Sequence, residues 1–320
     1  MVMHWLAELD GRRVAVEVPA TSANLGAGYD CLAVALGLVN RVNLEVRGWG
    51  RGDVELSVEG EGSGELPATA ENRFVRGVET VLREVRGELP QGVGWRVTMR
   101  NAIPLARGLG SSAAATVGGV VAGNALLGEP LTTRDLLRVA AQIEGHPDNA
   151  AAALLGGFVV VGPGDDGFET MRFDAPRDLR ALLFVPELRL DTDQMRAVLP
   201  ATVPRADAVA NVGRVAIGVA GLATGRFELL RALTVDRLHE PYRARVYPQL
   251  PRLIEAARGA GAIGACLSGA GSAVLAFGDS LAGLSRVEAA LLAAAADTDL
   301  PGRILVVSPR NHGAQVLGRT

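Results

Sequence analysis

The stretch PLARGLGSSAAATVGG, residues 104–119, decides which fold this chain can adopt. Gly108 and Gly110 let backbone amides approach an anion closely, because glycine has no Cβ and tolerates unusual backbone angles. A helix of small residues is expected over 111–127, and the unpaired N–H groups at its start favour a phosphate. We therefore expect this loop to bind the phosphates of a nucleotide through backbone donors.

The chain contains no lysine, so its 32 basic residues are all arginine. A Walker loop needs a lysine after its glycines, and a protein kinase needs one on a strand. Pyridoxal phosphate enzymes and Schiff-base aldolases need a lysine amine. The absence of lysine therefore excludes all of these enzyme classes.

The glycine loop has two competing interpretations. GLGSSA, 108–113, also matches the dinucleotide-binding pattern G-x-G-x-x-A, which requires a second strand ending in an acidic residue about 20 residues further on. Asp135 has that spacing, but it lies in the first turn of another expected helix with no strand between, which argues against an NAD-dependent oxidoreductase. The other interpretation is a helix that packs closely through small residues and binds nothing.

The composition is that of an ordinary globular chain, with 48% apolar and 21% charged residues and a net charge of −3. It offers no basic surface of the kind that nucleic acid requires. Cys31 and Cys266 have no metal-ligating neighbours, and we interpret both as small buried residues. The N-terminal segment shows no export signal, and no uninterrupted apolar run of about 18 residues occurs. We expect a cytoplasmic protein with no membrane or nucleic-acid partner.

Period-two alternation predicts half-buried antiparallel strands around 14–18, 54–58 and 95–99. Apolar spacing predicts a helix over 71–85, and another over 131–145 that starts at Thr132 or Thr133 and ends at Gly145. Further strands are expected at 156–162, 180–185, 263–268, 272–277 and 303–307, and further helices at 191–198, 205–223, 248–258 and 283–296. The polar, glycine-rich stretch 162–167 suggests a boundary between two domains, 1–164 and 165–320.

Two more loops carry an unusual density of small polar residues. VPATSANLGAGYDCLAVAL, 18–36, groups Thr21, Ser22, Asn24 and Asp30 around two glycines just after a strand. CLSGAGSAVLAF, 266–277, places a Ser-Gly-Ala-Gly-Ser turn between two apolar strands, where it could form a simple hairpin or line a ligand. Three such loops in one chain favour a ligand site over three unrelated turns.

Together these stretches resemble the GHMP family of small-metabolite kinases, and the similarity spans nearly the whole chain. Residues 104–114 resemble the family's nucleotide loop, and SGAGSAV, 268–274, is similar to its C-terminal glycine motif. Four further segments resemble the branch of the family that phosphorylates L-homoserine: PATSANLGAGYDCLAVAL at 19–36, EGHPDNAAAALLGGFV at 144–159, LDTDQMRAVLP at 190–200 and LHEPYR at 238–243.

The departures from the family pattern are mild. Ala27 stands where proline is usual, Tyr29 where phenylalanine is usual, and Ser272-Ala273 replace Pro-Thr. None of them removes a polar group that is expected to act. Ala27 leaves the loop around it less rigid.

The resemblance implies an α+β, two-domain GHMP-kinase fold. Its N-terminal nucleotide-binding domain carries a left-handed βαβ crossover (ribosomal protein S5 domain 2-like), and its C-terminal domain is ferredoxin-like. The implied reaction is the ATP- and Mg²⁺-dependent phosphorylation of the side-chain hydroxyl of L-homoserine to O-phospho-L-homoserine, on the route to threonine. A homodimer is a further expectation.

The resemblance also implies the nucleotide residues. Ser112 and Glu144 match the family's metal positions, and oxygen ligands suit Mg²⁺. Asn72 matches a position near the nucleoside, although Arg73 replaces the leucine that is usual beside it. Arg107 either pairs with phosphate or is simply solvated. The full nucleotide set is Asn72, Pro104, Leu105, Ala106, Arg107, Gly108, Leu109, Gly110, Ser111, Ser112, Ala113 and Ala114.

On the substrate side, Arg196 and Arg243 match positions that hold the carboxylate of the amino acid, for which arginine is the natural partner. Asp30 and Asp148 are candidates for the ammonium group. The substrate set is Asn24, Asp30, His146, Asp148, Thr192, Arg196, Arg243 and Gly269.

At the position where the mevalonate branch of the family places a catalytic aspartate, this chain has Asn149, which cannot act as a base. Asn24 is the other amide expected near the reacting hydroxyl. We therefore expect catalysis by alignment and charge stabilisation, without a strong protein base. The alternatives are a family member that acts on another alcohol such as mevalonate, which has no amine, and a catalytically idle regulator, against which intact Ser112, Glu144 and Asn149 argue.

Overall fold

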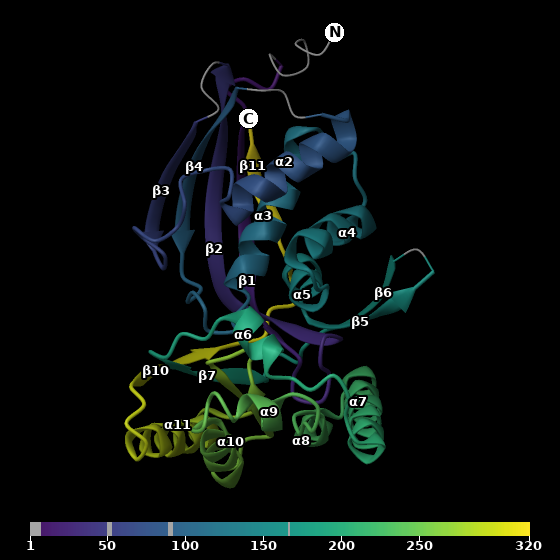
Figure 1. The fold of residues 1–320 in the computed structure, drawn as a ribbon, viewed down its shortest axis with the longest axis vertical. Coiled ribbons are helices and arrows are strands. Elements are labelled where there is room, and N and C mark those ends of the chain that lie inside the picture. The colour runs from purple at the N-terminus through teal and green to yellow at the C-terminus, as the bar shows by residue number, and fades with distance from the viewer. Residues whose placement is uncertain (1–7, 50–52, 89–91, 166) are drawn as a thin grey trace.

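The computed structural model describes residues 8–49, 53–88, 92–165 and 167–320. Figure 1 shows two stacked halves. One is a large sheet with helices packed beside it, and the other is a smaller sheet with helices beneath it. A short helix, α6 (Thr192–Ala197), lies where the two halves meet. The two-domain α+β architecture expected from the sequence is therefore confirmed.

The larger sheet has seven strands, of which five follow the order β11-β1-β2-β4-β3, while β5 pairs with β2 and β6 with β5. Its strands are β1 (Arg13–Ala23), β2 (Leu32–Trp49), β3 (Val54–Gly60), β4 (Val93–Asn101), β5 (Phe158–Gly164), β6 (Gly167–Phe173) and β11 (Gln315–Arg319). β2 is the central strand, because it pairs antiparallel with β1, β4 and β5.

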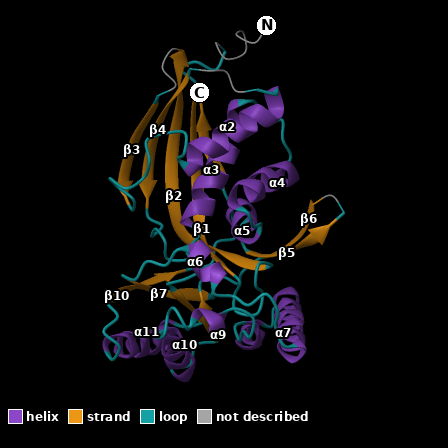
Figure 2. Cartoon of the chain, viewed as in Figure 1, coloured by secondary structure: helices purple, strands orange, loops and turns teal. Residues whose placement is uncertain are grey.

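Four helices cover one face of this sheet (Figure 2): α2 (Arg73–Arg86), α3 (Ser111–Leu126), α4 (Thr133–Glu144) and α5 (Asp148–Leu155). α3 and α2 approach closely, since a Cβ on Gly119 would lie 2.0 Å from the carbonyl oxygen of Phe74. Close packing through small residues, one of the interpretations of this helix, is therefore correct. It coexists with a ligand-facing N-terminus, because the two involve different parts of α3.

The prediction that all the early strands are antiparallel was wrong for one pair. β3 and β4 run parallel, with Val54 opposite Trp95 and Val58 opposite Met99. Period-two alternation reports that one face is buried and does not encode direction. The two strands are joined through α2, so they form the βαβ unit that the family resemblance implies.

The smaller sheet is antiparallel with the order β10-β7-β9-β8, formed by β7 (Arg180–Pro186), β8 (Gly264–Leu267), β9 (Val274–Gly278) and β10 (Gly302–Val307). α10 (Leu250–Gly259) and α11 (Leu281–Ala296) pack against it. The strand order and the β-α-β-β-α-β succession are those of a ferredoxin-like domain. The connection between β7 and α10 also contains α6, α7 (Arg205–Thr224), η1 (Phe227–Leu229), α8 (Leu230–Leu233) and α9 (Glu240–Arg243).

The two halves share part of their cores. The rings of Phe158 on β5 and Phe277 on β9 lie 5.9 Å apart, and the larger apolar cluster includes residues from both sheets. A second cluster fills the space between the smaller sheet, α10 and α11. Cys266 is buried as expected, whereas Cys31 is only partly buried.

The predicted domain boundary after residue 164 lies at the turn of the β5–β6 hairpin, which projects from the body in Figure 1. The last strand, β11, returns to the larger sheet beside β1. The division into 1–164 and 165–320 stays a prediction.

Within the described residues, α7 is the one helix long and apolar enough to cross a membrane, with a mean hydropathy of 1.3 over its window. The helix expected at 205–223 is thus present, and the charged residues Asp207 and Arg214 interrupt its apolar run. Its inner side packs against α8 and η1. Length and composition alone are weak grounds for a membrane span.

Candidate active site

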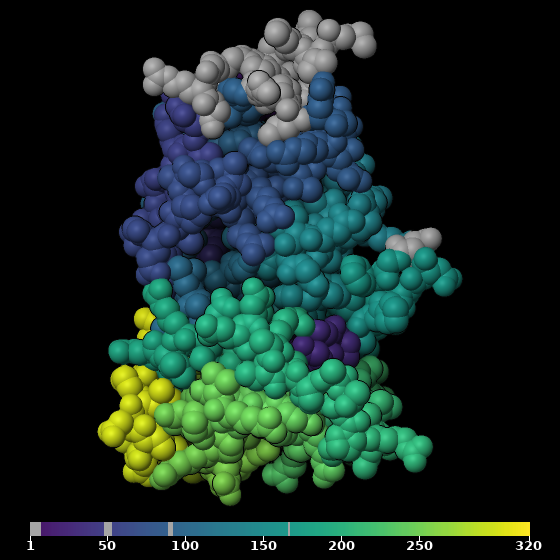
Figure 3. All heavy atoms as spheres, viewed as in Figure 1, coloured from purple at the N-terminus to yellow at the C-terminus, as the bar shows by residue number. Residues whose placement is uncertain are grey.

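A cavity of about 520 Å³ lies where the two halves meet. Figure 3 shows that purple residues of the N-terminal part reach the surface at this junction, between the teal and green parts of the chain. The cavity is lined by the loop before α3, the ends of β1 and α4, the start of α5, α6, α9 and the β8–β9 loop. The three polar loops singled out in the sequence therefore meet at one place.

The loop before α3 turns its carbonyl oxygens away from the cavity. Thr21 N donates to Leu109 O at 3.1 Å, Ala273 N to Arg107 O at 3.0 Å, and Leu190 N to Ala106 O at 3.4 Å. The hydroxyl of Ser268 lies 2.7 Å from Gly108 O. Four consecutive carbonyls are thus fixed by three other segments of the chain.

The amides of the same loop are left free. In the part of the chain that the structure describes, no hydrogen bond uses the backbone N–H groups of 108–113, and no side chain caps α3. The next backbone amide, that of Ala114, is not free, because it donates to Gly110 O inside the first turn. Unpaired amides at the start of a 16-residue helix form an anion site through their dipoles.

Gly110 makes this geometry possible. It caps α3 in the left-handed conformation, with φ 69°, and a Cβ there would lie 1.9 Å from the Thr21 hydroxyl oxygen. Only glycine combines this backbone angle with such a close neighbour.

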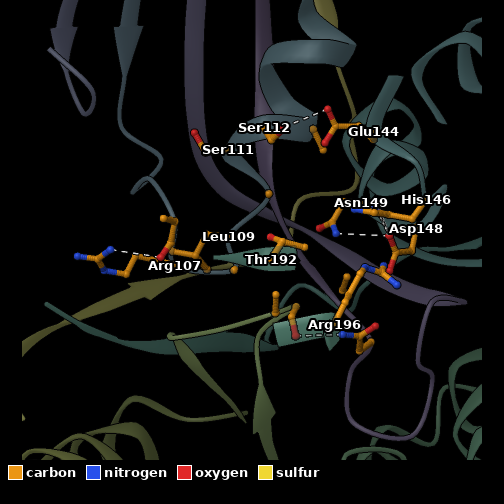
Figure 4. A pocket seen from close by; sticks show the side chains of 18 of the residues that line it. Arg107, Leu109, Ser111, Ser112, Glu144, His146, Asp148, Asn149, Thr192 and Arg196 are labelled. Carbon is orange, nitrogen blue, oxygen red and sulfur yellow. Dashed lines mark hydrogen bonds and ion pairs between the residues drawn. The ribbon is translucent and has the colours of Figure 1, made fainter. Parts of the chain in front are cut away.

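Ser112 and Glu144 lie together on the helix side of the cavity (Figure 4). The Ser112 hydroxyl donates to Glu144 Oε1 at 3.0 Å, and the Thr116 hydroxyl donates to the same oxygen at 2.6 Å. The Glu144 side chain is only 5% exposed, and Nη1 of Arg73 lies 3.6 Å from its Oε1. Among the described residues no group of three or more His, Cys, Asp or Glu could hold a metal, so this is no closed protein cage. One carboxylate with one hydroxyl suits Mg²⁺, which keeps water and phosphate ligands.

His146, Asp148 and Asn149 form a connected cluster at the start of α5 (Figure 4). Asp148 Oδ1 lies 2.9 Å from His146 Nδ1 and accepts from Asn149 N at 2.7 Å. The hydrogen bond to Asp148 raises the pKa of His146 above its ordinary value. The Thr21 hydroxyl donates to Asn149 Oδ1 at 2.7 Å, so the amide of Asn149 is held in one orientation.

Arg196 and Asp30 pair with each other across the cavity. Arg196 donates from Nη1 and Nη2 to the two carboxylate oxygens of Asp30 at 2.9 and 2.8 Å. The hydroxyl of Tyr29 also accepts from Arg196 Nη1 at 2.9 Å. Both charged side chains are 34% exposed. The pairing with Asp30 raises the pKa of Arg196.

Arg243, at the end of α9, lines the cavity and is 1% exposed. Its guanidinium donates to Met195 O at 3.2 Å and to Gly269 O at 2.9 Å. Gly269 O also accepts from Asn24 Nδ2 at 3.0 Å, while Asn24 Oδ1 accepts from Asp30 N at 3.0 Å. Both ends of the Asn24 amide are therefore used within the protein.

Most of the residues predicted from the sequence line this cavity, and three do not. Every predicted substrate residue lines it, including Thr192 and Gly269, as do Ser112 and Glu144. Asn72, Leu105 and Ala114 do not. Asn72 instead caps α2, where its side chain accepts from Phe74 N and donates to Pro67 O.

Arg107 lines the cavity and binds backbone carbonyls, while its pairing with phosphate stays a prediction. Its guanidinium donates to the carbonyls of Leu105, Ala106, Pro186 and Glu187 at 2.6–3.2 Å. It therefore fastens the glycine loop to the end of β7.

Sequence reasoning gave no role to Thr21, Tyr29, Arg73 or His239. Tyr29 and Arg73 could have been singled out from the sequence, since both depart from the family pattern. Thr21 and His239 stood inside quoted motifs, but their contacts join segments far apart in the chain.

Comparisons with known proteins agree on one family. Residues 72–157 match the model for the GHMP kinases N terminal domain, and residues 219–297 match the GHMP kinases C terminal model. The chain is 41% identical over 302 residues to a homoserine kinase of Moorella thermoacetica, covering 94% of this chain and 99% of that one. The crystal structure of homoserine kinase from Cytophaga hutchinsonii is similar with a TM-score of 0.83 at 30% identity, covering 95% of this chain and 97% of that one. The crystal structure of L. major mevalonate kinase in complex with R-mevalonate has a TM-score of 0.63 at 16% identity, covering 93% of this chain and 95% of that one, which shows the fold alone.

The free amides before α3 predict a specific effect of Gly110→Ala. The new Cβ would collide with Thr21 and take the left-handed backbone, which costs an alanine about 1–2 kcal/mol by itself. Gly87→Ala is the matched control, because Gly87 caps α2 at φ 83° with nothing within 4 Å of a Cβ. We expect Gly110→Ala to lower the melting temperature more than Gly87→Ala, and to weaken ATP binding by at least about tenfold in titration calorimetry. Equal melting temperatures and equal ATP affinities for the two variants would contradict the role of this loop.

Proposed function

This chain belongs to the homoserine kinases of the GHMP kinase family, and on that premise we propose that it transfers the terminal phosphoryl group of ATP to the side-chain hydroxyl of L-homoserine. The product is O-phospho-L-homoserine. One observation supports the proposal most strongly. The free amides at the start of α3 and the Asp30–Arg196 pair, which could bind the charged groups of an amino acid, line the same cavity. A cytoplasmic location stays a prediction. A homodimer and the lack of a membrane or nucleic-acid partner stay predictions.

The nucleotide half works without a lysine because backbone donors bind the phosphates. The free amides of 108–113 supply directed N–H groups, and the dipole of α3 adds a partial positive charge. Ser112 and Glu144 would hold Mg²⁺, which neutralises phosphate charge when bound. Phosphoryl transfer asks a protein mainly for such positioning and charge stabilisation.

The substrate half suits a zwitterion. Asp30 and Arg196 now satisfy each other in a two-fold ion pair. An amino acid can exchange partners with this pair, its ammonium replacing the guanidinium at Asp30 and its carboxylate replacing Asp30 at Arg196. Because both side chains are partly exposed, the pair is weak enough to open. Arg243 adds a second cation for the carboxylate.

No residue at the hydroxyl is suited to act as a strong base. Asn149 cannot accept a proton, and its Oδ1 already accepts from Thr21. Asp148 is buried, and its carboxylate is hydrogen-bonded to the His146 ring and to the backbone N–H of Asn149. The proton therefore leaves late, to the transferred phosphoryl group, while Asn149 aligns the hydroxyl.

Mevalonate or a similar alcohol is the second candidate substrate. Mevalonate carries a carboxylate for the arginines but no amine for Asp30, which would lose Arg196 and gain no cation in return. The low identity to mevalonate kinase supports only a shared fold. The Asp30–Arg196 pair thus favours the amino acid.

The proposed substrate predicts the outcome of one assay. ADP release should be measured with L-homoserine, L-serine, L-threonine and mevalonate side by side. We expect L-homoserine to have the highest kcat/KM, since it alone offers the zwitterion and a primary hydroxyl two carbons from the α-carbon. No turnover of L-homoserine above background would refute the proposed function.

The alignment role predicts a loss of kcat in Asn149→Ala. We expect kcat to fall by roughly 10²-fold, as for the loss of one aligned donor at a transition state, with no new ionisation in the pH profile. Thr21→Val is the control, because it removes only the hydroxyl that orients Asn149 and should cost less. A fall of kcat on the acidic side of the pH profile, at about pH 4 to 6, that disappears in Asp148→Asn would instead identify a carboxylate base.

The proposed role of Arg243 as a second cation for the carboxylate predicts that its removal raises the KM for L-homoserine. Arg243→Leu should raise the KM for L-homoserine by roughly 10- to 100-fold, because charge-assisted hydrogen bonds of about 1.5–3 kcal/mol are lost. Arg245→Leu is the matched control, since Arg245 is exposed and packs over Tyr242 outside the cavity. The same KM in both variants would exclude Arg243 from substrate binding.

A further inference from the structure

The guanidinium of Arg243 is held by the protein on two of its three nitrogens. Nε donates to Met195 O, and Nη1 donates both to Gly269 O at 2.9 Å and to His239 Nδ1 at 3.1 Å. Among the described residues none accepts a hydrogen bond from Nη2. Since Arg243 lines the cavity, Nη2 is the nitrogen left for a ligand.

His239 can make its contacts in one tautomer only. Arginine is a donor and never an acceptor, so Nδ1 of His239 must present its lone pair to Arg243. Nε2 lies 2.8 Å from Gly26 O, which can only accept, so Nε2 must carry the hydrogen. The ring thereby links the 24–30 loop to Arg243 in a fixed orientation.

The surroundings of His239 keep this tautomer neutral. The side chain is completely buried, and burial lowers its pKa to about 4 against the opposing effect of Asp236. The charged groups that face it are Asp236, whose Oδ2 lies 3.7 Å from Nε2, Asp30 and Arg243. The Tyr29 ring covers the imidazole, with centroids 5.3 Å apart.

The backbone that carries His239 is fixed by a buried carboxylate. Asp236 accepts from His239 N and Glu240 N at 2.7 Å and from Leu238 N at 2.9 Å. Asn211 Nδ2 donates to it from α7 at 2.7 Å. His239 therefore sits on a rigid turn at the start of α9, the helix that ends with Arg243.

We propose that His239 is a positioning residue, which orients the Arg243 guanidinium so that Nη2 faces the carboxylate of the substrate. This inference rests on the proposed function, in that Arg243 is taken to bind an amino acid. Without an acceptor at Nδ1, the guanidinium would keep only the bonds from Nε to Met195 O and from Nη1 to Gly269 O, and its orientation would be less restricted. Binding of a carboxylate needs an N–H aimed at it, so a freely turning group binds more weakly.

The tautomer is tested directly by ¹⁵N NMR of the imidazole in the full-length protein at pH 7, without substrate. The inference expects a protonated Nε2 and an unprotonated Nδ1 for His239, with no titration between about pH 5.5 and 8. A protonated Nδ1 could not accept from Arg243 and would overturn the inference, whatever the substrate of the enzyme.

Two substitutions separate orientation from folding. His239→Phe keeps a ring against Tyr29 but removes both the donor and the acceptor, whereas His239→Gln keeps one amide donor and one acceptor. We expect His239→Phe to raise the KM for L-homoserine by about tenfold or more, with the KM for ATP unchanged and kcat changed less than KM, and His239→Gln to restore part of the loss. Leu253→Ala, a buried core residue away from the cavity, is the control that lowers the melting temperature with both KM values unchanged.

The outcomes are distinguishable. If His239→Phe loses melting temperature like Leu253→Ala but keeps the wild-type KM for L-homoserine, His239 is merely structural and the inference fails. If the wild type does not turn over L-homoserine, the proposed function fails and the tautomer measurement still decides the orientation of Arg243. If His239→Phe does not fold, His239→Gln and the tautomer measurement decide.

Discussion

The carbonyl oxygens of residues 106–109 all accept hydrogen bonds from segments outside their own loop, and the rest of the site depends on this. A peptide group that commits its oxygen to one side presents its N–H to the other. By tying the oxygens to β1, to the segment before α6 and to the β8–β9 loop, the fold aims a row of amides into the cavity. The anion site is therefore a product of tertiary structure, and a lysine is not needed to create it.

The two substrate arginines are held in opposite ways. Arg196 is partly exposed and bound to a charged partner, so a ligand must first displace Asp30. Arg243 is buried, and among the described residues its hydrogen-bond acceptors are neutral, two carbonyls and an imidazole, so no carboxylate is hydrogen-bonded to it. On the proposed function, Arg243 would therefore attract the carboxylate without having to release an anion, whereas Arg196 would tie recognition of the carboxylate to recognition of the ammonium.

The sequence predicted the loops better than the contacts between them. Gly108, Gly110 and the following helix could be identified because their backbone angles and small side chains are local properties. The direction of β3 could not, because alternation records burial and not pairing. The 18-residue strand β2 was not predicted. Its register with β1 shifts where Pro19 and Ala20 of β1 face Val39 and Leu36 of β2, and the alternation of β2 breaks between those two residues. Arg107 and His239 bind partners about 80 and 213 residues away, and no local pattern reports such contacts.

The return of β11 to the edge of β1 has a consequence for biosynthesis. Residues 13–23 are made early, but the strand that covers their outer edge lies at 315–319. While the ribosome is still making the second half, β1 carries a row of unsatisfied peptide groups on that side. An open strand edge is where nascent chains pair wrongly, so the first half is most exposed to aggregation until residues 315–319 have been made.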